Sequence, residues 1–196
     1  MAYEHTNRCG ETYYLQAGKP TKTGKPRYHF GRKLTKTAVE EIPAGFEVYE
    51  SPERGIVYLR KEKPSRIADF EREFVAEAIQ KCADVADSIV DIDGDSLVVY
   101  TSSMSNQNVD ELFDMLGNGR MFGLATVRAS LVRKSPYEKM LRFDLADADE
   151  RLFTAQRWCF VGSIDNWIFV HGPAPLDELV QELAPHLGQE SFFELM

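Results

Sequence analysis

The stretch SIVDIDGDSLVVY, residues 88–100, decides the fold of this 196-residue chain. Two β-type runs flank Asp93 and Gly94, and this dipeptide between apolar runs predicts a β-hairpin with a type I′ turn. Apolar and polar residues also alternate over 124–133 and 141–145. A final pair of runs, at 152–161 and 167–171, predicts another hairpin. Together these runs indicate an antiparallel sheet.

Three helices are expected around this sheet. The first begins near Ser65, and its apolar residues recur with a period close to 3.6. Those residues are Ile67, Phe70, Phe74, Ala78, Cys82, Val85 and Ile89. Asn108 begins the second helix, since Glu111 follows three residues later as in a capping box, and Gly117 ends it. The last helix carries Leu176, Leu179, Val180 and Leu183.

Charge divides the chain into two parts. Residues 1–66 hold 13 Lys or Arg against 8 Asp or Glu, a net charge of +5, whereas residues 67–196 hold 10 against 23, a net charge of −13. Short β-type runs separated by Gly and Pro fill the first part. We therefore expect an α+β protein, with a small, basic, β-rich module at 1–64 and an acidic α+β domain at 65–196.

Composition excludes several classes of protein. Hydrophobic residues make up 43% and charged residues 28%, which is typical of a globular chain. The longest strictly apolar runs have four residues, so we expect no membrane-spanning helix and no membrane partner. The first ten residues lack an apolar segment of the secretory type. Three widely spaced cysteines suggest thiols in a reducing compartment, and a cytoplasmic location is expected.

One segment resembles a known module. The stretches YYL, TKTGKPRYHF and EIPAGFEVYESPERGIVYLRK lie between Tyr13 and Lys61. They resemble a short module that recurs in bacterial proteins of uncharacterised function. The resemblance implies a bacterial, cytoplasmic origin and assigns no reaction, ligand or site residue. It does not extend to residues 67–196.

The first candidate site is the basic stretch KPTKTGKPRYHFGRKLTK, residues 19–36. Its cations could contact phosphates, and its interleaved aromatic residues could stack on single-stranded bases. The anion-binding candidates are Lys19, Lys22, Lys25, Arg27, Arg32 and Lys33, and the stacking candidates are Tyr28 and Phe30. Two other interpretations stay open, a solvated loop above core aromatics and a loop that docks on the acidic domain.

The second candidate site is the C-terminal hairpin. Trp158 and Phe160 share one strand face by their two-residue spacing, as do Trp167, Phe169 and His171. An even-numbered connection would place both sets on the same face of the sheet. That face could be packed core, or it could be an aromatic pocket with His171 or Arg157 at its rim.

Motifs of catalysis and metal binding are missing from the sequence. It contains no GxSxG, no GxGxxG and no cysteine or histidine pair with zinc spacing. Asp91, Asp93 and Asp95 lack the spacing of a calcium loop and suit a hairpin turn better. No catalytic residue, metal or cofactor is therefore predicted.

These observations favour a non-catalytic binding or regulatory protein. Its partner could be a protein, or a nucleic acid or other polyanion bound by the basic stretch, and the oligomeric state is left open. The alternative is an enzyme with a small-molecule pocket on the aromatic face of the C-terminal hairpin.

Overall fold

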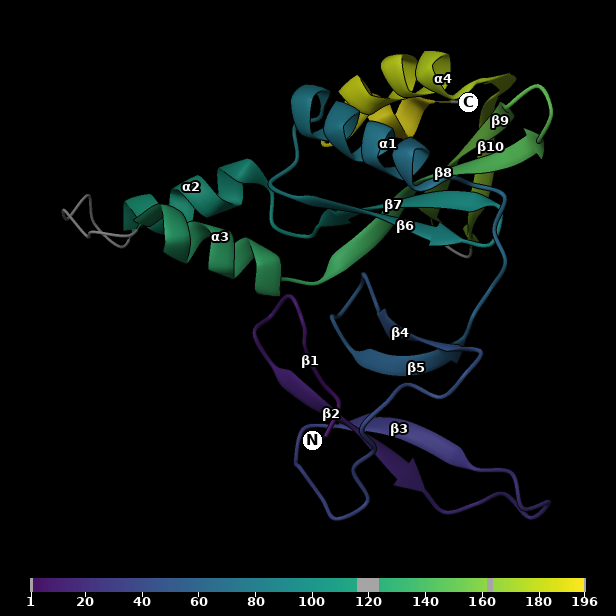
Figure 1. The fold of residues 1–196 in the computed structure, drawn as a ribbon. Coiled ribbons are helices and arrows are strands. Elements are labelled where there is room, and N and C mark those ends of the chain that lie inside the picture. Colours follow the sequence, from purple (N-terminus) through teal and green to yellow (C-terminus); the bar gives the residue numbers. More distant parts are fainter. Residues whose placement is uncertain (1, 116–123, 162–163, 196) are drawn as a thin grey trace. The chain divides into compact units, whose positions relative to one another are not determined.

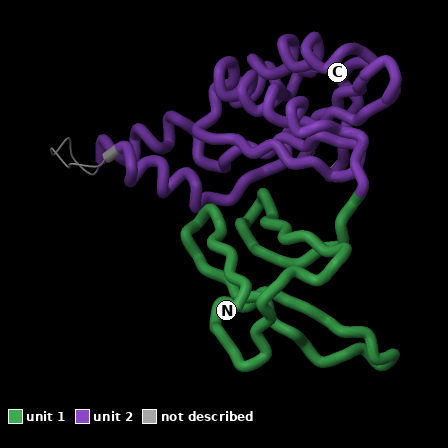
Figure 2. Tube along the Cα trace, viewed as in Figure 1, with its two compact units in different colours: residues 1–63 green, residues 64–196 purple. Residues whose placement is uncertain are grey.

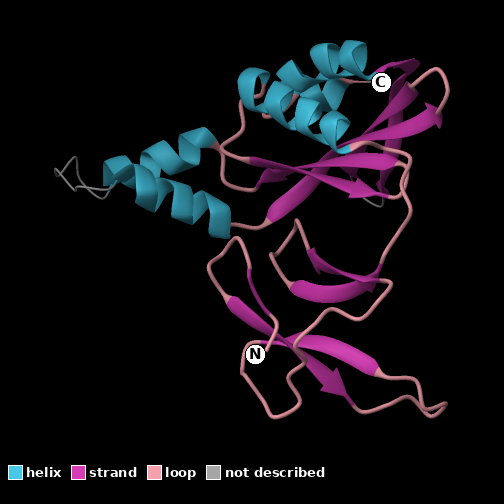
Figure 3. Ribbon diagram, viewed as in Figure 1, coloured by secondary structure: helices cyan, strands magenta, loops and turns pink. Residues whose placement is uncertain are grey.

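The computed structural model describes residues 2–115, 124–161 and 164–195. The chain forms two compact units, unit 1 at Met1–Lys63 and unit 2 at Pro64–Met196 (Figure 2). Figure 3 shows that unit 1 consists of strands and loops, whereas the helices lie in unit 2. All sheets are antiparallel, and the predicted α+β class with a β-rich N-terminal part is confirmed.

Unit 1 contains a three-stranded sheet and a two-stranded hairpin. The strands are β1 (Glu4–Thr6), β2 (Thr12–Gly18), β3 (Arg27–Gly31), β4 (Phe46–Glu50) and β5 (Val57–Lys61). β2 is central between β1 and β3, and β4 pairs with β5. Alternation along β2 buries Tyr13 and Leu15, because successive side chains of a strand point to opposite faces.

Unit 2 is built on a five-stranded sheet of order β10-β9-β8-β7-β6. Its strands are β6 (Ser88–Asp93), β7 (Ser96–Ser102), β8 (Tyr137–Asp147), β9 (Leu152–Val161) and β10 (Ile164–Pro175). The β6–β7 hairpin forms where the sequence predicts it, with Asp93 opposite Ser96. Gly94 has a φ of +64° and Asp95 does not have a positive φ. A positive φ at the first central residue alone corresponds to a type II′ turn, so the predicted type I′ turn is wrong.

Two helices, α1 (Asp69–Cys82) and α4 (Leu176–Leu183), cover one face of this sheet (Figure 1). Short 3₁₀ helices, η1 (Ala184–His186) and η2 (Glu190–Glu194), follow α4. The core between the layers contains Leu97, Leu141, Phe143 and Phe153 from the strands, each at most 1% exposed. Helix α4 contributes Leu176, Leu179, Val180 and Leu183, all buried, as the sequence pattern predicts.

Helix α1 packs on a different face from the predicted one. Its buried residues are Glu71, Val75 and Ile79, whereas Phe70 and Phe74 are exposed. It also begins after Ala68 rather than at Ser65, and it ends at Cys82, so that Ile89 belongs to β6. The Glu71 carboxylate accepts a hydrogen bond from the Ala68 N–H at 2.8 Å, the reach-back contact of a capping box.

Residues 124–134 form a helix, so the strand predicted over 124–133 is wrong. Helices α2 (Asn106–Met115) and α3 (Leu124–Lys134) project from one end of the sheet as a hairpin (Figure 3). Apolar residues at 124, 127 and 131 also fit a helical period, and that period prevails over the alternation. Arg128 of α3 forms an ion pair with Asp110 of α2. Helix α2 begins two residues before the predicted Asn108, and Gly117 lies outside the described residues.

The described helices are short. The longest, α1, has 14 residues. Within the described ranges, none has the length and apolar character needed to cross a membrane.

Candidate functional site

The loop between β2 and β3 and its flanks carry the predicted anion-binding cations. We name residues 18–36 the basic hairpin. All seven of its cations are exposed, namely Lys36 and the six predicted anion-binding residues Lys19, Lys22, Lys25, Arg27, Arg32 and Lys33. Of these six, the first three lie in the loop, Arg27 begins β3, and the last two follow β3 directly.

Backbone hydrogen bonds give the tip of the basic hairpin a defined shape. The Thr21 N–H donates to the Lys25 carbonyl at 2.9 Å, and the Gly24 N–H donates to the Thr21 carbonyl at 2.9 Å. The Lys25 N–H also donates to Thr21 Oγ1 at 2.9 Å. Gly24 has a φ of +77°, a conformation that glycine adopts without strain. Lys22 and Lys25 therefore extend from an ordered turn.

Most of these cations have no acidic partner. Lys19, Lys22, Lys25, Arg27 and Lys33 form no ion pair with any residue in the described part of the chain. Arg32 differs, because its guanidinium lies 2.7 Å from the Glu11 carboxylate and 3.4 Å from the Tyr13 hydroxyl. The hydrogen bond to Tyr13, with the charges of Tyr13 and Glu11, raises the pKa of Arg32 above its ordinary value. Arg32 is thus engaged within unit 1.

Tyr28 and Phe30 lie on the packed side of β3. Their register partners on β2 are Ala17 and Leu15, and Leu15 is fully buried. Both rings are half-buried, and the Phe30 ring centroid lies 6.2 Å from that of Tyr3. Packing against the unit 1 core leaves these rings less open to base stacking than the sequence pattern alone would suggest.

The aromatic residues of the C-terminal hairpin form a continuous cluster. Trp158 lies opposite Trp167, and their ring centroids are 4.9 Å apart. Phe160 lies on the same side of β9, with its ring 6.0 Å from that of Trp158. Phe160 and Phe169 are 53% and 56% exposed, whereas Trp158 is 6% exposed. The predicted shared face holds for these four residues because Trp158 and Trp167 are directly paired.

Two cations of β8 cover the tryptophan rings. Lys139 Nζ lies 3.5 Å from the Trp158 ring centroid, and the Arg142 guanidinium lies 4.9 Å from that of Trp167. Arg142 also contacts Asp144 at 3.0 Å and donates to the Gln156 side chain at 2.8 Å. Both cations of this face thus lie over its rings, whereas Arg142 Nε and the Trp158 indole N–H are buried without a hydrogen-bond partner in the described part of the chain.

His171 is not part of this aromatic face, contrary to the prediction. A register shift between Phe169 and His171 places His171 opposite Ala155, which belongs to the core side of the sheet. Its Nε2 atom lies 3.7 Å from the Glu182 carboxylate of α4. The extra residue of a β-bulge re-aims the side chains that follow it, and a two-residue period cannot reveal such a bulge. Arg157, the other predicted rim residue, is buried and donates to the Leu195 carbonyl at 2.7 Å.

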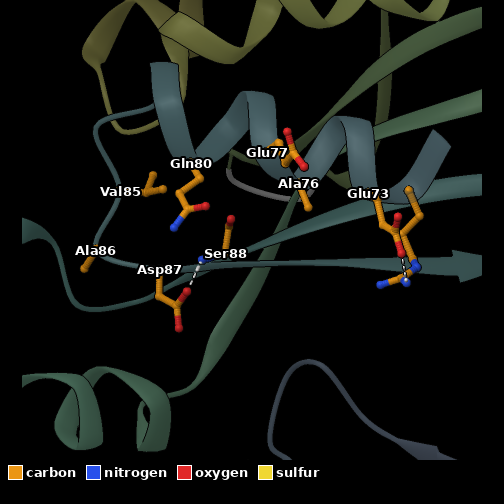
Figure 4. A pocket seen from close by; sticks show the side chains of 9 residues that line it. Glu73, Ala76, Glu77, Gln80, Val85, Ala86, Asp87 and Ser88 are labelled. Carbon is orange, nitrogen blue, oxygen red and sulfur yellow. Dashed lines mark hydrogen bonds and ion pairs between the residues drawn. The ribbon is translucent and has the colours of Figure 1, made fainter. Parts of the chain in front are cut away.

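A groove of about 410 Å³ runs between α1 and the start of β6 (Figure 4). Its labelled side chains include Glu73, Glu77, Gln80 and Asp87. The Asp87 carboxylate accepts hydrogen bonds from the Ser88 N–H at 2.9 Å and from the Tyr137 hydroxyl at 2.7 Å. Asp87 is thus a structural acceptor, and the groove brings together no general acid–base pair.

A second groove of about 350 Å³ lies at the other end of α1. Phe70 and Phe74 of α1 form one wall, and Pro175 and Leu176 at the start of α4 form another. The sequence assigns Phe70 and Phe74 to the core, and for this reason the groove is missed. A buried charged residue beside exposed aromatics is visible only in three dimensions.

Among the described residues, no group of three or more His, Cys, Asp or Glu side chains could hold a metal ion. Asp95 of the predicted turn cluster is held by Arg66, whose guanidinium lies 2.6 Å from the carboxylate. No family model matches the chain, and no curated protein or solved structure matches it significantly.

Proposed function

We propose that this chain is a non-catalytic binding protein whose basic hairpin contacts the phosphates of nucleic acid. The observation that carries the proposal is a set of exposed cations along the basic hairpin that have no acidic partners in the described residues. Lys19, Lys22, Lys25, Arg27 and Lys33 form this set. By contrast, Arg8 of unit 1 forms an ion pair with Glu50, and Arg60 forms one with Glu47.

A set of exposed lysines favours a polyanion over a single small anion. Each lysine is a flexible point charge without the fixed fork that recognises one carboxylate or phosphate bidentately. A polyanion contacts several of them at once, and binding is driven by the release of its condensed counterions. Unit 1 supports such contacts, since residues 1–63 hold 12 Lys or Arg against 8 Asp or Glu.

Contacts with the phosphate backbone of the nucleic acid are favoured over contacts with its bases. Tyr28 and Phe30 pack on the Leu15 side of the unit 1 sheet and are only half-exposed. Phosphate contacts position a protein on nucleic acid but carry no sequence information. We therefore expect binding that depends weakly on sequence and strongly on salt.

The alternative, an enzyme with a pocket on the aromatic face, has less support. Lys139 and Arg142, the cations of that face, contact the rings of Trp158 and Trp167. His171, a predicted residue of its rim, lies 3.7 Å from Glu182 of α4 instead.

The test measures binding of the full chain to a labelled 20-residue oligothymidine and to a 20-base-pair duplex by fluorescence anisotropy. The double variant Lys22→Glu/Lys25→Glu should bind about tenfold or more weakly. Its log–log salt slope should be shallower by about 1.4, since each lost contact contributes about 0.7 on a single strand. Tyr28→Ala should leave the affinity unchanged if bases do not stack there.

The matched control is Lys81→Glu/Lys134→Glu, which changes the net charge equally but lies on helices of unit 2. Both lysines are exposed, and Lys81 forms only a surface pair with Glu77. Equal loss of affinity in the two double variants, or no binding of the unmodified chain at low salt, would refute the proposal.

A further inference from the structure

The groove between α1 and α4 in unit 2 exposes aromatic side chains that the fold could have buried. Phe70 is 69% exposed and Phe74 is 40% exposed. They are four residues apart on α1 and therefore lie on the same side of the helix. Large contiguous apolar patches at the surface of a folded chain mark interaction sites more often than isolated apolar residues do.

An ion pair between the buried Glu71 and the half-exposed Arg151 holds α1 in the orientation that exposes these rings. The Glu71 side chain is 6% exposed, and its carboxylate accepts hydrogen bonds from Arg151 Nε, at 3.1 Å, and from Arg151 Nη2. Arg151 Nη1 also donates to the Arg66 carbonyl at 3.1 Å. Rotating α1 to bury Phe70 and Phe74 would break these contacts and leave charges unpaired.

The floor of the groove is apolar and fixed. Phe153 is fully buried, and Leu176 is 8% exposed. The Arg151 guanidinium lies 5.7 Å from the Phe153 ring centroid. Arg151 has a φ of +53°, the only positive value among the described non-glycine residues. A left-handed backbone of this kind persists where surrounding contacts hold it, as the bonds of Arg151 to Glu71 and to the Arg66 carbonyl do here.

The rim of the groove is acidic. Glu150 and Asp177 line it, both are exposed, and neither forms an ion pair with a described residue. Asp69 and Glu73 precede Phe70 and Phe74 in α1 without lining the groove, and among the described residues each forms an ion pair with Arg72 alone, at 3.9 and 3.7 Å. Arg151, the cation of the groove, is already neutralised by Glu71. An apolar floor with an acidic rim fits an occupant that combines apolar and cationic groups.

We infer that this groove binds a short segment of a partner protein that carries aromatic or aliphatic residues next to Lys or Arg. The apolar residues insert between Phe74 and Leu176, and the cations meet Glu150 and Asp177 at the rim. A two-fold pairing of this groove with a second copy is disfavoured, because isologous contact would bring two acidic rims together.

The test presents the full chain to a library of random 12-residue peptides displayed on phage. We expect the selected peptides to be enriched in Lys or Arg together with aromatic or aliphatic residues. A synthetic peptide of the consensus should bind the double variant Phe70→Ser/Phe74→Ser at least about tenfold more weakly, as when interface anchors are truncated. Glu150→Gln/Asp177→Asn should weaken binding and reduce its salt dependence.

The control is Phe193→Ser, which removes a 58% exposed phenylalanine from η2 and should leave peptide binding unchanged. Circular dichroism of each variant establishes that it is folded. The inference would be overturned if the selected peptides showed no enrichment in Lys, Arg or apolar residues. It would also be overturned if the consensus peptide bound Phe70→Ser/Phe74→Ser as tightly as the unmodified protein. Concentration-dependent dimers in light scattering that disappear in this variant would also overturn it, since the occupant would then be a second copy. None of these outcomes depends on the basic hairpin of unit 1.

Discussion

Helices α1 and α4 pack on the same face of one sheet, yet their burial follows different rules (Figure 1). Helix α4 buries every apolar residue of its stripe, from Leu176 to Leu183. Helix α1 buries Glu71 and leaves Phe70 and Phe74 exposed. The apolar stripe therefore orients α4, whereas α1 combines the burial of Val75 and Ile79 with a charged contact between Glu71 and a residue 80 positions away.

This difference teaches that a side chain's partner can outweigh its hydrophobicity. Burying a phenylalanine is favourable by about 1.5–3 kcal/mol. Hydrogen bonds to charged groups contribute about 1.5–3 kcal/mol each, and Glu71 accepts several. The two effects are of similar size, so the orientation of α1 depends on where Arg151 lies.

The largest effect on stability is expected in α4. Leu179→Ala should lower the free energy of unfolding by about 2–5 kcal/mol, because Leu179 is fully buried and its truncation leaves a cavity. Urea denaturation followed by circular dichroism measures this change. Glu178→Ala, an exposed neighbour on the same helix, should stay within about 0.5 kcal/mol of the unmodified protein. If Leu179→Ala leaves the free energy of unfolding unchanged, α4 is not held by its apolar stripe.

A smaller loss of stability is expected from a substitution in α1. Glu71→Ala should lower the free energy of unfolding by about 2–3 kcal/mol, since it removes a capping acceptor and leaves Arg151 without its partner. Arg151 is 38% exposed, and its rehydration limits the loss. Glu73→Ala, at an exposed position of the same helix, serves as the control in the same denaturation assay. If the two variants are equally stable, the ion pair does not orient α1.

The smallest effect on stability is expected in the segment that precedes α1. The Arg66 N–H donates to Asp95 Oδ1 at 2.9 Å, and its guanidinium donates to Oδ2 at 2.9 and 2.6 Å. The hydrogen bond from the Arg66 side chain lowers the pKa of Asp95 below its ordinary value. A carboxylate of this kind stabilises the fold above its unfolded-state pKa of about 3.9, and this contribution disappears as the pH falls through the folded-state value.

Asp95→Asn should therefore lower the melting temperature slightly at pH 7, and less than Glu71→Ala does. The difference from the unmodified protein should shrink as the pH falls from about 4 through the lower folded-state pKa of Asp95, because the unfolded state binds the proton first and the folded state only afterwards. Thermal melts between pH 2.5 and 7 measure it. If the difference in melting temperature is independent of pH, the charge of Asp95 does not stabilise the segment that precedes α1.

Several features of the site were predictable from local pattern. Two-residue alternation with an even connection places Trp158 and Trp167 on one side of the sheet, whereas their direct pairing comes from the register that the structure shows. The cations of the basic hairpin are exposed because a Gly- and Pro-containing loop has no apolar residues to bury. His171 was misplaced because a β-bulge changes the phase of a strand without any mark in the apolar pattern.

Local periodicity was enough for the antiparallel sheet, the β6–β7 hairpin and the buried face of α4, since each depends on neighbouring residues in the chain. It was not enough for α3, where apolar residues fit both a two-residue and a helical period. It was wrong for α1, because the partner of Glu71 is distant in sequence and becomes adjacent only when the β8–β9 turn meets the helix. The contact between Glu71 and Arg151 leaves Phe70 and Phe74 exposed and so creates the groove that they line. A buried carboxylate without a partner costs more free energy than an exposed aromatic ring.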